Sequence, residues 1–553
     1  MLRNLTGLVV IVIGLLFLSS RLDVVSAQSP NAWQDKVDPT VLAAANLGET
    51  DFLIYMEQQA DLSGAANVSG KEAKGTYVYN QLTATAQQTQ PAVTAVLDGL
   101  GASHKSFWAV NAILARGNLA AVQAVASLDA VSYISPNGEG TLSLPTQAQA
   151  AAAERAPSAV EWNIALVRAP EAWALGFTGQ NVVVAGADTG VAWEHAALKG
   201  QYRGWNGAEA NHDYNWHDAI PVADPVAECP AFSPEPCDDD VLLGGGHGTH
   251  TVGTMVGYDG GENQIGMAPG AEWIACRNMK SGVGVIATYM DCMQWFLAPT
   301  EIGGGNPDPA MSPHVINNSW GCVEGCDPNT PGGVVNLQIL RELSQNIRMA
   351  GIVFVASAGN DGPECSTIEF PPAVYPESFT VGATDNMDNI ADFSSRGPSI
   401  LSEDPLNPVL KPNISAPGVD VRSSLRDGSY DTLSGTSMAG PHVAGLVALV
   451  ISANPALAGE VDAIENLIEQ TAVHLTTDEA CGGDTADQVP NYTYGWGRID
   501  ALAAVEAASA PTSVQLGGVE AQGGSNAGAG LWVAGALLAA TGLTLLLRRA
   551  RRA

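Results

Sequence analysis

The chain has 553 residues, and 46% of them are hydrophobic, which is enough to build large buried cores and excludes a globally disordered protein. Its 57 acidic residues outnumber its 24 basic residues, giving a net charge of −33. The whole excess falls within residues 158–530, which carry 45 acidic and 12 basic side chains. Such a surface repels phosphate backbones, so we expect no nucleic-acid partner.

Residues 1–27 have the pattern of a secretory signal peptide. A basic start is followed by an apolar run over 5–18 and by the small residues Val25-Ser26-Ala27 before the expected cleavage site. The alternative is an uncleaved membrane anchor. We therefore expect an exported protein that lies at the cell surface or outside the cell.

The next part of the chain is expected to form a small α+β unit over residues 51–135, after a polar and unpatterned leader over 28–50. A linker rich in Ala, Gln, Pro and Ser follows over 136–158. The expected elements of the unit are a strand opening the segment 51–62, a helix over 75–101, a strand over 106–117, and a helix then a strand over 118–137.

From Ser158 onward, apolar runs rich in Val and Ile alternate with helical segments, which is typical of an α/β fold with a buried parallel sheet. We expect one large domain over 159–510. Its expected strands lie in the segments 181–190, 272–279, 314–321, 351–360 and 378–385.

The end of the chain predicts a membrane anchor. A Gly/Ala/Ser-rich spacer over 511–529 leads to the anchor and its basic tail over 530–553. Residues 530–547 are uncharged, span about 27 Å as a helix and precede four arginines, which should stay in the cytoplasm. The alternatives are a terminal helix packed on the domain, or an anchor released after cleavage at a Gly-rich signal over 521–530.

All eight cysteines follow residue 228, and in an exported chain an even number favours disulfides. A zinc site is the alternative, but no CxxC pair or closely spaced histidine accompanies these cysteines. Closeness in sequence favours the pairs Cys229–Cys237, Cys276–Cys292, Cys322–Cys326 and Cys365–Cys481.

Four polar residues lie at strand ends and helix starts, which are positions typical of catalytic side chains. Asp188 ends an apolar strand, Asn360 follows another, and His247 and Ser437 stand at the starts of two expected helices. Taken singly, each has an ordinary structural explanation as a turn or cap residue. A metal shared by His247 and His250 lacks the accompanying carboxylate of a zincin site.

Taken together, the four residues lie in motifs that resemble those of the subtilisin-like serine peptidases. The order Asp188, His247, Ser437 is the order of their triad. Similarity to the bacillopeptidase F type of this family extends over most of 158–510, and the N-terminal unit resembles the inhibitor-type prodomain of the same peptidases. The motifs are DTGV, HGTHTVGTMVG, SAGN and GTSMAGPHVAG.

The resemblance implies an extracellular serine endopeptidase that is made as an autoprocessed zymogen and acts on proteins and peptides. Ser437 is the implied nucleophile, His247 the general base and Asp188 its orienting partner. Asn360 is the implied oxyanion donor, and Ser319-Trp320-Gly321 the implied substrate-binding segment. The prodomain is the implied intramolecular inhibitor, and the chemistry needs no cofactor or metal.

Departures from the family concern structural calcium. The usual aspartate after the catalytic-Asp motif is replaced by about Ala197, which leaves a looser candidate site over 259–263. The run Asp238-Asp239-Asp240 is either a second calcium candidate or, as we expect, a solvated acidic loop.

Three other functions are weighed against the peptidase. An α/β-hydrolase esterase needs a G-x-S-x-G elbow and the order Ser, Asp, His. A serine-carboxyl peptidase needs Glu at His247 and Asp at Asn360. A catalytically dead binding module is not supported, because all four chemical groups are present.

Overall fold

The computed structural model describes residues 32–142, 160–224, 228–241, 245–322, 324–399 and 409–510. Residues up to Ser509 belong to one compact unit. The expected signal peptide, spacer and C-terminal anchor lie outside the described residues.

The centre of the larger domain is a parallel sheet of seven strands in the order β13-β12-β11-β10-β6-β8-β7. The expected parallel α/β architecture is therefore confirmed. The strands are β6 (Val183–Asp188), β7 (Trp216–Asp218), β8 (Glu272–Arg277), β10 (Val315–Asn318), β11 (Val353–Ser357), β12 (Phe379–Thr384) and β13 (Ile414–Pro417).

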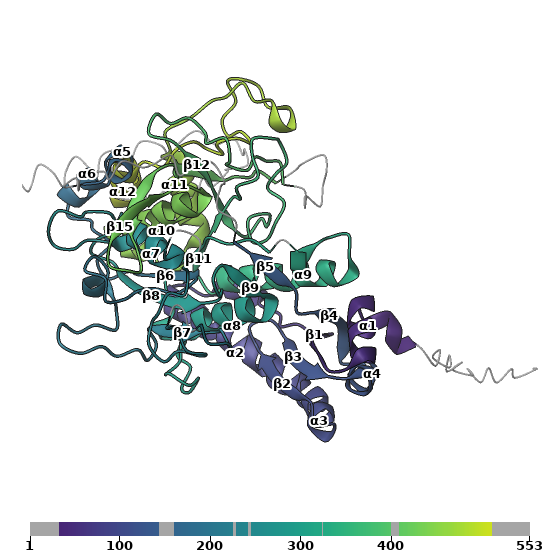
Figure 1. Cartoon of the computed structure of the whole chain (residues 1–553). Helices are drawn as coiled ribbons and strands as arrows, with labels where there is room; N and C mark the ends of the chain where they lie inside the picture. The colour runs from purple at the N-terminus through teal and green to yellow at the C-terminus, as the bar shows by residue number, and fades with distance from the viewer. Residues whose placement is uncertain are drawn as a thin grey trace, which may run out of the picture. The chain divides into compact units, whose positions relative to one another are not determined.

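Helices cover both faces of this sheet (Figure 1). In the central strands β6, β8, β10 and β11, neighbouring residues enter different cores. Val184 packs in the core formed with α7 and α10, whereas Ala185 packs in the core formed with α8 and α9. Burial on both faces explains why these strands are continuous apolar runs. The helices are α5 (Trp162–Leu166), α6 (Ala169–Ala174), α7 (His247–Val256), α8 (Ile286–Leu297), α9 (Pro331–Met349), α10 (Thr436–Ala453), α11 (Val461–Gln470) and α12 (Ala501–Ser509).

The N-terminal unit contains an antiparallel sheet in the order β2-β3-β1-β4. One face packs on its own helices through Phe52, Ile54 and Met56, while the other, with Leu53 and Tyr55, joins the core that contains α8 and α9. The elements are α1 (Pro39–Leu47), β1 (Thr50–Met56), α2 (Lys71–Thr89), α3 (Pro91–Gly99), β2 (Ser103–Phe107), β3 (Ala112–Gly117), α4 (Leu119–Ala126) and β4 (Val131–Pro136).

Two expectations for this unit are wrong. Part of the expected leader is folded: α1 buries Val41 and Ala45 in the core of the sheet, so the unit begins before residue 51. The single helix expected over 75–101 is two helices, because Pro91 cannot donate a backbone hydrogen bond and instead starts α3.

The linker expected over 136–158 is partly structured. After β4, residues Glu139–Thr141 form the short strand β5, which pairs antiparallel with β9 (Val283–Val285) of the larger domain (Figure 1). Residues 143–159 lie outside the described residues.

Polar contacts hold the N-terminal unit against α8 and α9. Lys105 Nζ lies 2.5 Å from Asp291 Oδ2, and the amide of Trp108 donates to Gln294 Oε1 over 2.6 Å. Tyr55 donates to Glu342. These contacts surround apolar packing, so the unit docks on the larger domain through a specific surface.

All eight cysteines form disulfides, and the four expected pairs are confirmed: Cys229–Cys237, Cys276–Cys292, Cys322–Cys326 and Cys365–Cys481. The alternative of a zinc site on these cysteines is wrong. Within the described ranges, one helix has the length and composition of a membrane span. It is α10, and it is buried in the core of the larger domain.

The disulfides should stabilise unequally, because their loops differ in length. Cys365–Cys481 spans 116 residues and Cys322–Cys326 spans four. Chain entropy predicts that replacing the first pair with serines lowers the free energy of unfolding by about 5 kcal/mol, and replacing the second by about 2 kcal/mol. Chemical denaturation of the two double variants checks the ranking, and equal losses would contradict it.

Candidate active site

The carboxyl edge of three neighbouring strands brings the first candidate residues together. In the register of the sheet, Asn318 of β10 lies between Ala187 of β6 and Ala356 of β11. The residues that follow these positions are therefore abreast at one edge, where α/β sheets place their sites. Asp188 is the last residue of β6, Ser319–Gly321 follow β10, and Asn360 follows β11.

The imidazole of His247 is held by Asp188. Nδ1 of His247 lies 2.7 Å from Asp188 Oδ1, and the two residues are 0% and 2% exposed. His247 is the first residue of α7, as the sequence predicts. Gly246 before it has a φ of 122°, and a Cβ there would lie 2.8 Å from the backbone nitrogen of Arg426, so only glycine fits.

Burial and the nearby carboxylates shift the pKa of His247 in opposite directions. A helix N-terminus favours a neutral imidazole, and burial also lowers the pKa of His247. The carboxylates of Asp188, Asp240 and Asp238 outweigh both effects, so the pKa of His247 is raised above its ordinary value.

Ser437 lies in the first turn of α10 and is 2% exposed. Its Oγ donates to the carbonyl oxygen of Ser319 over 3.4 Å. Nε2 of His247 has no hydrogen-bond partner among the described residues. The structure thus joins Asp188 to His247, and Ser437 to Ser319, but no hydrogen bond links His247 to Ser437.

The side chain of Asn360 is attached to the residue before Ser437. Its Oδ1 accepts from the backbone nitrogen of Thr436 over 2.9 Å and from Thr436 Oγ1 over 3.0 Å. Because the oxygen is fixed, the direction of the Nδ2 donors is fixed as well. Asn360 and Ser437 line the same cavity of about 60 Å³.

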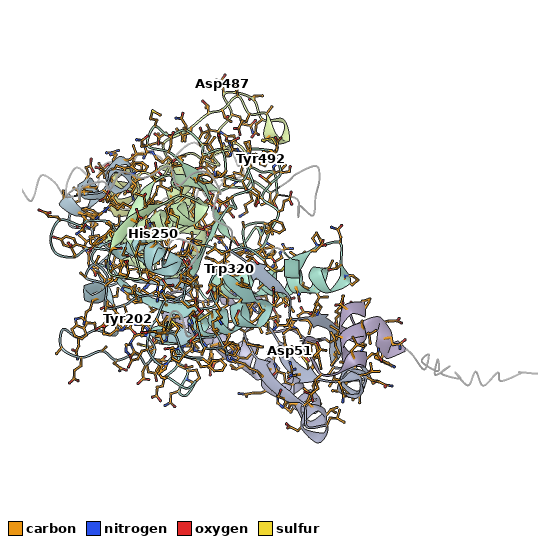
Figure 2. All side chains as sticks on the ribbon, viewed as in Figure 1. Asp51, Tyr202, His250, Trp320, Asp487 and Tyr492 are labelled. Atoms are coloured by element: carbon orange, nitrogen blue, oxygen red, sulfur yellow. A yellow bond between two sulfur atoms is a disulfide. The ribbon has the colours of Figure 1, made fainter. Side chains whose placement is uncertain are left out.

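The segment Ser319-Trp320-Gly321 lines this cavity together with the end of the N-terminal unit. Trp320, which is labelled in Figure 2, is buried. It stacks on Tyr289 with ring centroids 3.9 Å apart. Thr141, the last residue of β5, and Leu142, which follows it, also line the cavity. The candidate residues and the tail of the N-terminal unit therefore share one site.

Strand β5 lies in a narrow channel beside this cavity. On one side it pairs with β9, and the amide of Leu142 donates to the carbonyl oxygen of Gly282 over 2.7 Å. On the other side, a Cβ at Gly140 would lie 3.0 Å from the carbonyl oxygen of Gly321 and 2.8 Å from Tyr289 Oη. A side chain at position 140 would therefore require Tyr289 or the backbone of Gly321 to shift.

Two segments close to the candidate residues were not predicted from the sequence as parts of the site. The edge that receives β5, residues 282–285, was marked only by its two glycines. The run Asp238-Asp239-Asp240 was expected to be a solvated loop, which is wrong, since these residues are 3%, 0% and 0% exposed. Their burial depends on partners that lie far away in the sequence, such as Arg277 and Ser281.

The residues proposed for calcium do not fit the ion. Asp259 already accepts from the amides of Gly261 and Asn263 and from Asn263 Nδ2, while Asn263 Oδ1 accepts from Arg422 over 2.8 Å. The oxygens that would ligate the ion are therefore engaged in hydrogen bonds. No cluster of metal-ligating side chains occurs among the residues that the structure describes.

Comparisons with known proteins bear on the same region. The family model described as the subtilase family matches residues 179–497. Bacillopeptidase F of Bacillus subtilis (strain 168) is 36% identical over 530 residues, which cover 90% of this chain and 34% of that protein. Subtilisin DY of Bacillus licheniformis is 31% identical over 350 residues, 63% of this chain and 99% of that protein. The chain thus spans about a third of the length of bacillopeptidase F and matches nearly all of subtilisin DY.

The raised pKa of His247 can be measured directly. Titration of the imidazole by NMR should give a pKa above about 6.5, the ordinary value for histidine. Asp188→Asn removes the nearest negative charge and should lower this pKa by about one unit or more. Asp487→Asn, on an exposed residue, is the control and should leave it unchanged. A pKa that Asp188→Asn does not lower would contradict this account.

Proposed function

The chain belongs to the subtilase family and is by class a serine endopeptidase, and from this premise we propose that it cleaves extracellular proteins through Asp188, His247 and Ser437. The buried contact between Asp188 and His247, at the sheet edge that also carries Ser319 and Asn360, supports this proposal most strongly. The start of α10 adds Ser437 to the same edge.

In the proposed mechanism, Ser437 Oγ attacks the carbonyl carbon of the scissile bond. Nε2 of His247 accepts the hydroxyl proton and later donates it to the leaving amine. This nitrogen is buried and has no other partner within the described residues, which leaves it available for the serine. Asp188 keeps the second ring nitrogen protonated and stabilises the imidazolium.

The oxyanion of the tetrahedral intermediate is proposed to accept hydrogen bonds from Asn360 Nδ2 and from the backbone nitrogen of Ser437. Thr436 holds the amide oxygen of Asn360, so the donors need no reorientation during the reaction. Loss of the asparagine donor costs subtilisin about 10²–10³-fold in kcat.

Substrates are proposed to bind as an added strand between residues 282–285 and Ser319–Gly321. The pairing of β5 with β9 supports this mode, because an extended segment of the same chain already uses this edge. Main-chain hydrogen bonds recognise any extended peptide, while the cavity beside Phe370 selects side chains.

The N-terminal unit is proposed to be an inhibitory prodomain. It covers α8 and α9, and its tail enters the cavity that contains Ser437. We propose that the enzyme cuts its own chain after the described tail, within residues 143–158, and that the prodomain blocks the site until it is removed. The proposed cut therefore lies within the linker expected over 136–158.

Export through residues 1–27 and anchoring through residues 530–553 remain proposals from the sequence. Their support is the pattern of apolar and basic residues at the two ends.

Maturation provides a direct test of the mechanism. Ser437→Ala removes the nucleophile and should accumulate as the unprocessed chain, whereas the natural protein should be cleaved and should react with a fluorophosphonate at Ser437. Gel mobility and mass spectrometry of purified protein measure both results. Normal processing of the variant, in the absence of other peptidases, would contradict cleavage in cis.

Localisation provides an independent test of the anchor. Deletion of residues 530–553 should leave peptidase activity unchanged and move the protein from the membrane to the soluble exported fraction. Fractionation and a peptide assay measure the two properties. The anchor is wrong if the natural protein is soluble while mass spectrometry still finds its C-terminal residues.

A further inference from the structure

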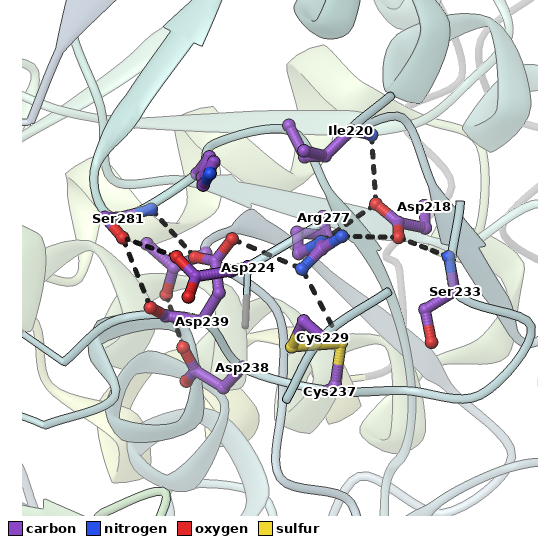
Figure 3. A network of polar contacts seen from close by, with 12 residues as sticks. Asp218, Ile220, Asp224, Cys229, Ser233, Cys237, Asp238, Asp239, Arg277 and Ser281 are labelled. Carbon is purple, nitrogen blue, oxygen red and sulfur yellow. Dashed lines mark hydrogen bonds and ion pairs between the residues drawn. A yellow bond between two sulfur atoms is a disulfide. The ribbon is translucent and has the colours of Figure 1, made fainter. Parts of the chain in front are cut away.

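The run Asp238-Asp239-Asp240 is a buried junction that three parts of the larger domain share (Figure 3). Three adjacent carboxylates would repel one another and are costly to bury without partners. Each of them has its own set of donors, and these donors lie on different elements. The donors bound by each carboxylate therefore indicate which part of the site that carboxylate positions.

Asp240 and Asp238 hold the start of α7. Oδ2 of Asp240 accepts from the backbone nitrogens of Gly246 and His247 over 3.2 and 3.0 Å. Oδ2 of Asp238 accepts from the amide and the hydroxyl of Thr249 over 3.0 and 2.6 Å. Backbone donors in the first turn of a helix otherwise lack partners, so these carboxylates fix the turn that carries His247.

Asp238 also holds the segment after Asp188. Its Oδ1 accepts from Thr189 Oγ1 over 2.9 Å, and Thr189 Oγ1 in turn accepts from the amide of Gly248 over 3.0 Å. The strand end that carries Asp188 and the helix that carries His247 are thus joined by one carboxylate. This contact acts in addition to the direct bond between the two residues.

Asp239 points to a different part of the site. Its Oδ1 accepts from the amide of Ser281 over 2.8 Å, directly before the edge that binds β5. Ser281 has a φ of 47°, a conformation that is unfavourable for serine and needs support from its surroundings. The carboxylate of Asp239 supplies one such support at the start of the proposed substrate-binding edge.

Arg277 holds the run through its guanidinium group. Its guanidinium is 0% exposed and forms a two-point ion pair with Asp218 at 2.8 and 2.7 Å. Nη1 reaches Asp239 Oδ2 over 3.2 Å, and Nη2 donates to the carbonyl oxygen of Pro230 (Figure 3). The disulfide Cys229–Cys237 ends directly before the run. The run is therefore fixed by a buried ion pair and a covalent bond.

We propose that Asp238–Asp240 is a positioning element with two separate effects, in which Asp240 orients the general base His247 and Asp239 orients the substrate-binding edge at Ser281. This inference rests on the proposed peptidase mechanism. Neither residue contacts the reacting atoms, so both act through the residues that they hold.

The charges around His247 make the first effect measurable. The groups that face it are Asp188 on β6, Asp238 and Asp240 before α7, and His250 on α7 itself. Burial lowers the pKa of His250 to about 3, so this histidine is neutral in the working range. Burial raises the pKa of Asp238 to about 6, so this side chain carries only part of its charge in the acidic range. Asp240→Asn removes a separate negative group near His247 and should lower the pKa of the imidazole, whereas Asp239→Asn should not.

The experiment compares Asp240→Asn and Asp239→Asn in the full chain, with Asp487→Asn as the exposed control. Fluorophosphonate titration counts active sites, and a peptide substrate then gives kcat, KM and the pH dependence of kcat/KM. Asp240→Asn should lower kcat about tenfold, keep KM within about twofold and move the acidic midpoint down by about half a pH unit. Asp239→Asn should raise KM about tenfold and leave kcat and the midpoint unchanged.

Conservative variants separate charge from geometry and serve if an asparagine variant fails to fold. Asp240→Glu keeps the charge but displaces the carboxylate, so it should lower kcat while the acidic midpoint stays at the natural value. Asp239→Glu should raise KM alone. The proposal is overturned if the variants change kcat and KM in the same proportion, with no shift of the midpoint, or if they lower only the melting temperature.

Labelling and activity of the natural protein show whether a failed test counts against the positioning element or against the peptidase mechanism. If the natural protein is neither labelled by fluorophosphonate nor active, the peptidase mechanism has failed. If it is labelled and active while the two asparagine variants behave alike, only the positioning element is wrong.

Discussion

The parallel register of β6, β10 and β11 is the constraint on which the site depends. Because Ala187, Asn318 and Ala356 lie abreast, the three strands end together and deliver their next residues to one edge. The strands are buried on both faces, which leaves these ends as the places where polar side chains can gather. The helices α7 and α10 then need only begin at the same edge to complete the site.

The site is built from buried polar groups, and each such group is stable only with its partners. Asp188 and His247 form a hydrogen bond with each other, and Thr436 holds the side chain of Asn360. Arg277 and the first turn of α7 hold the acidic run. Removal of one partner leaves a charge or donor in a medium of low polarity. The stability of the fold and the alignment of the candidate residues therefore rest on the same contacts.

Much of the fold could be predicted from local patterns, and the failures share a physical cause. Continuous Val/Ile runs identified β6, β10 and β11, and the motifs located His247 and Ser437 at helix starts. The helix α1 was missed because it offers only Val41 and Ala45 to a core formed by distant strands. The burial of Asp239 could not be foreseen, since it depends on Arg277, which lies 38 residues further along the chain. Contacts between residues so far apart in the chain produce no pattern in the local sequence.

The disulfide Cys365–Cys481 closes a long loop, and on the proposed export route this bond can form only late. Ser437 lies between Cys365 and Cys481, and the chain is made from its N-terminus. On the proposed route across the membrane, Cys481 emerges only after the elements that carry Asp188, His247 and Ser437 have already passed. On that route, covalent closure follows the passage of all three candidate residues, and it takes place where oxidation is possible. The long loop that contains Ser437 would stay open in a chain that never left a reducing compartment.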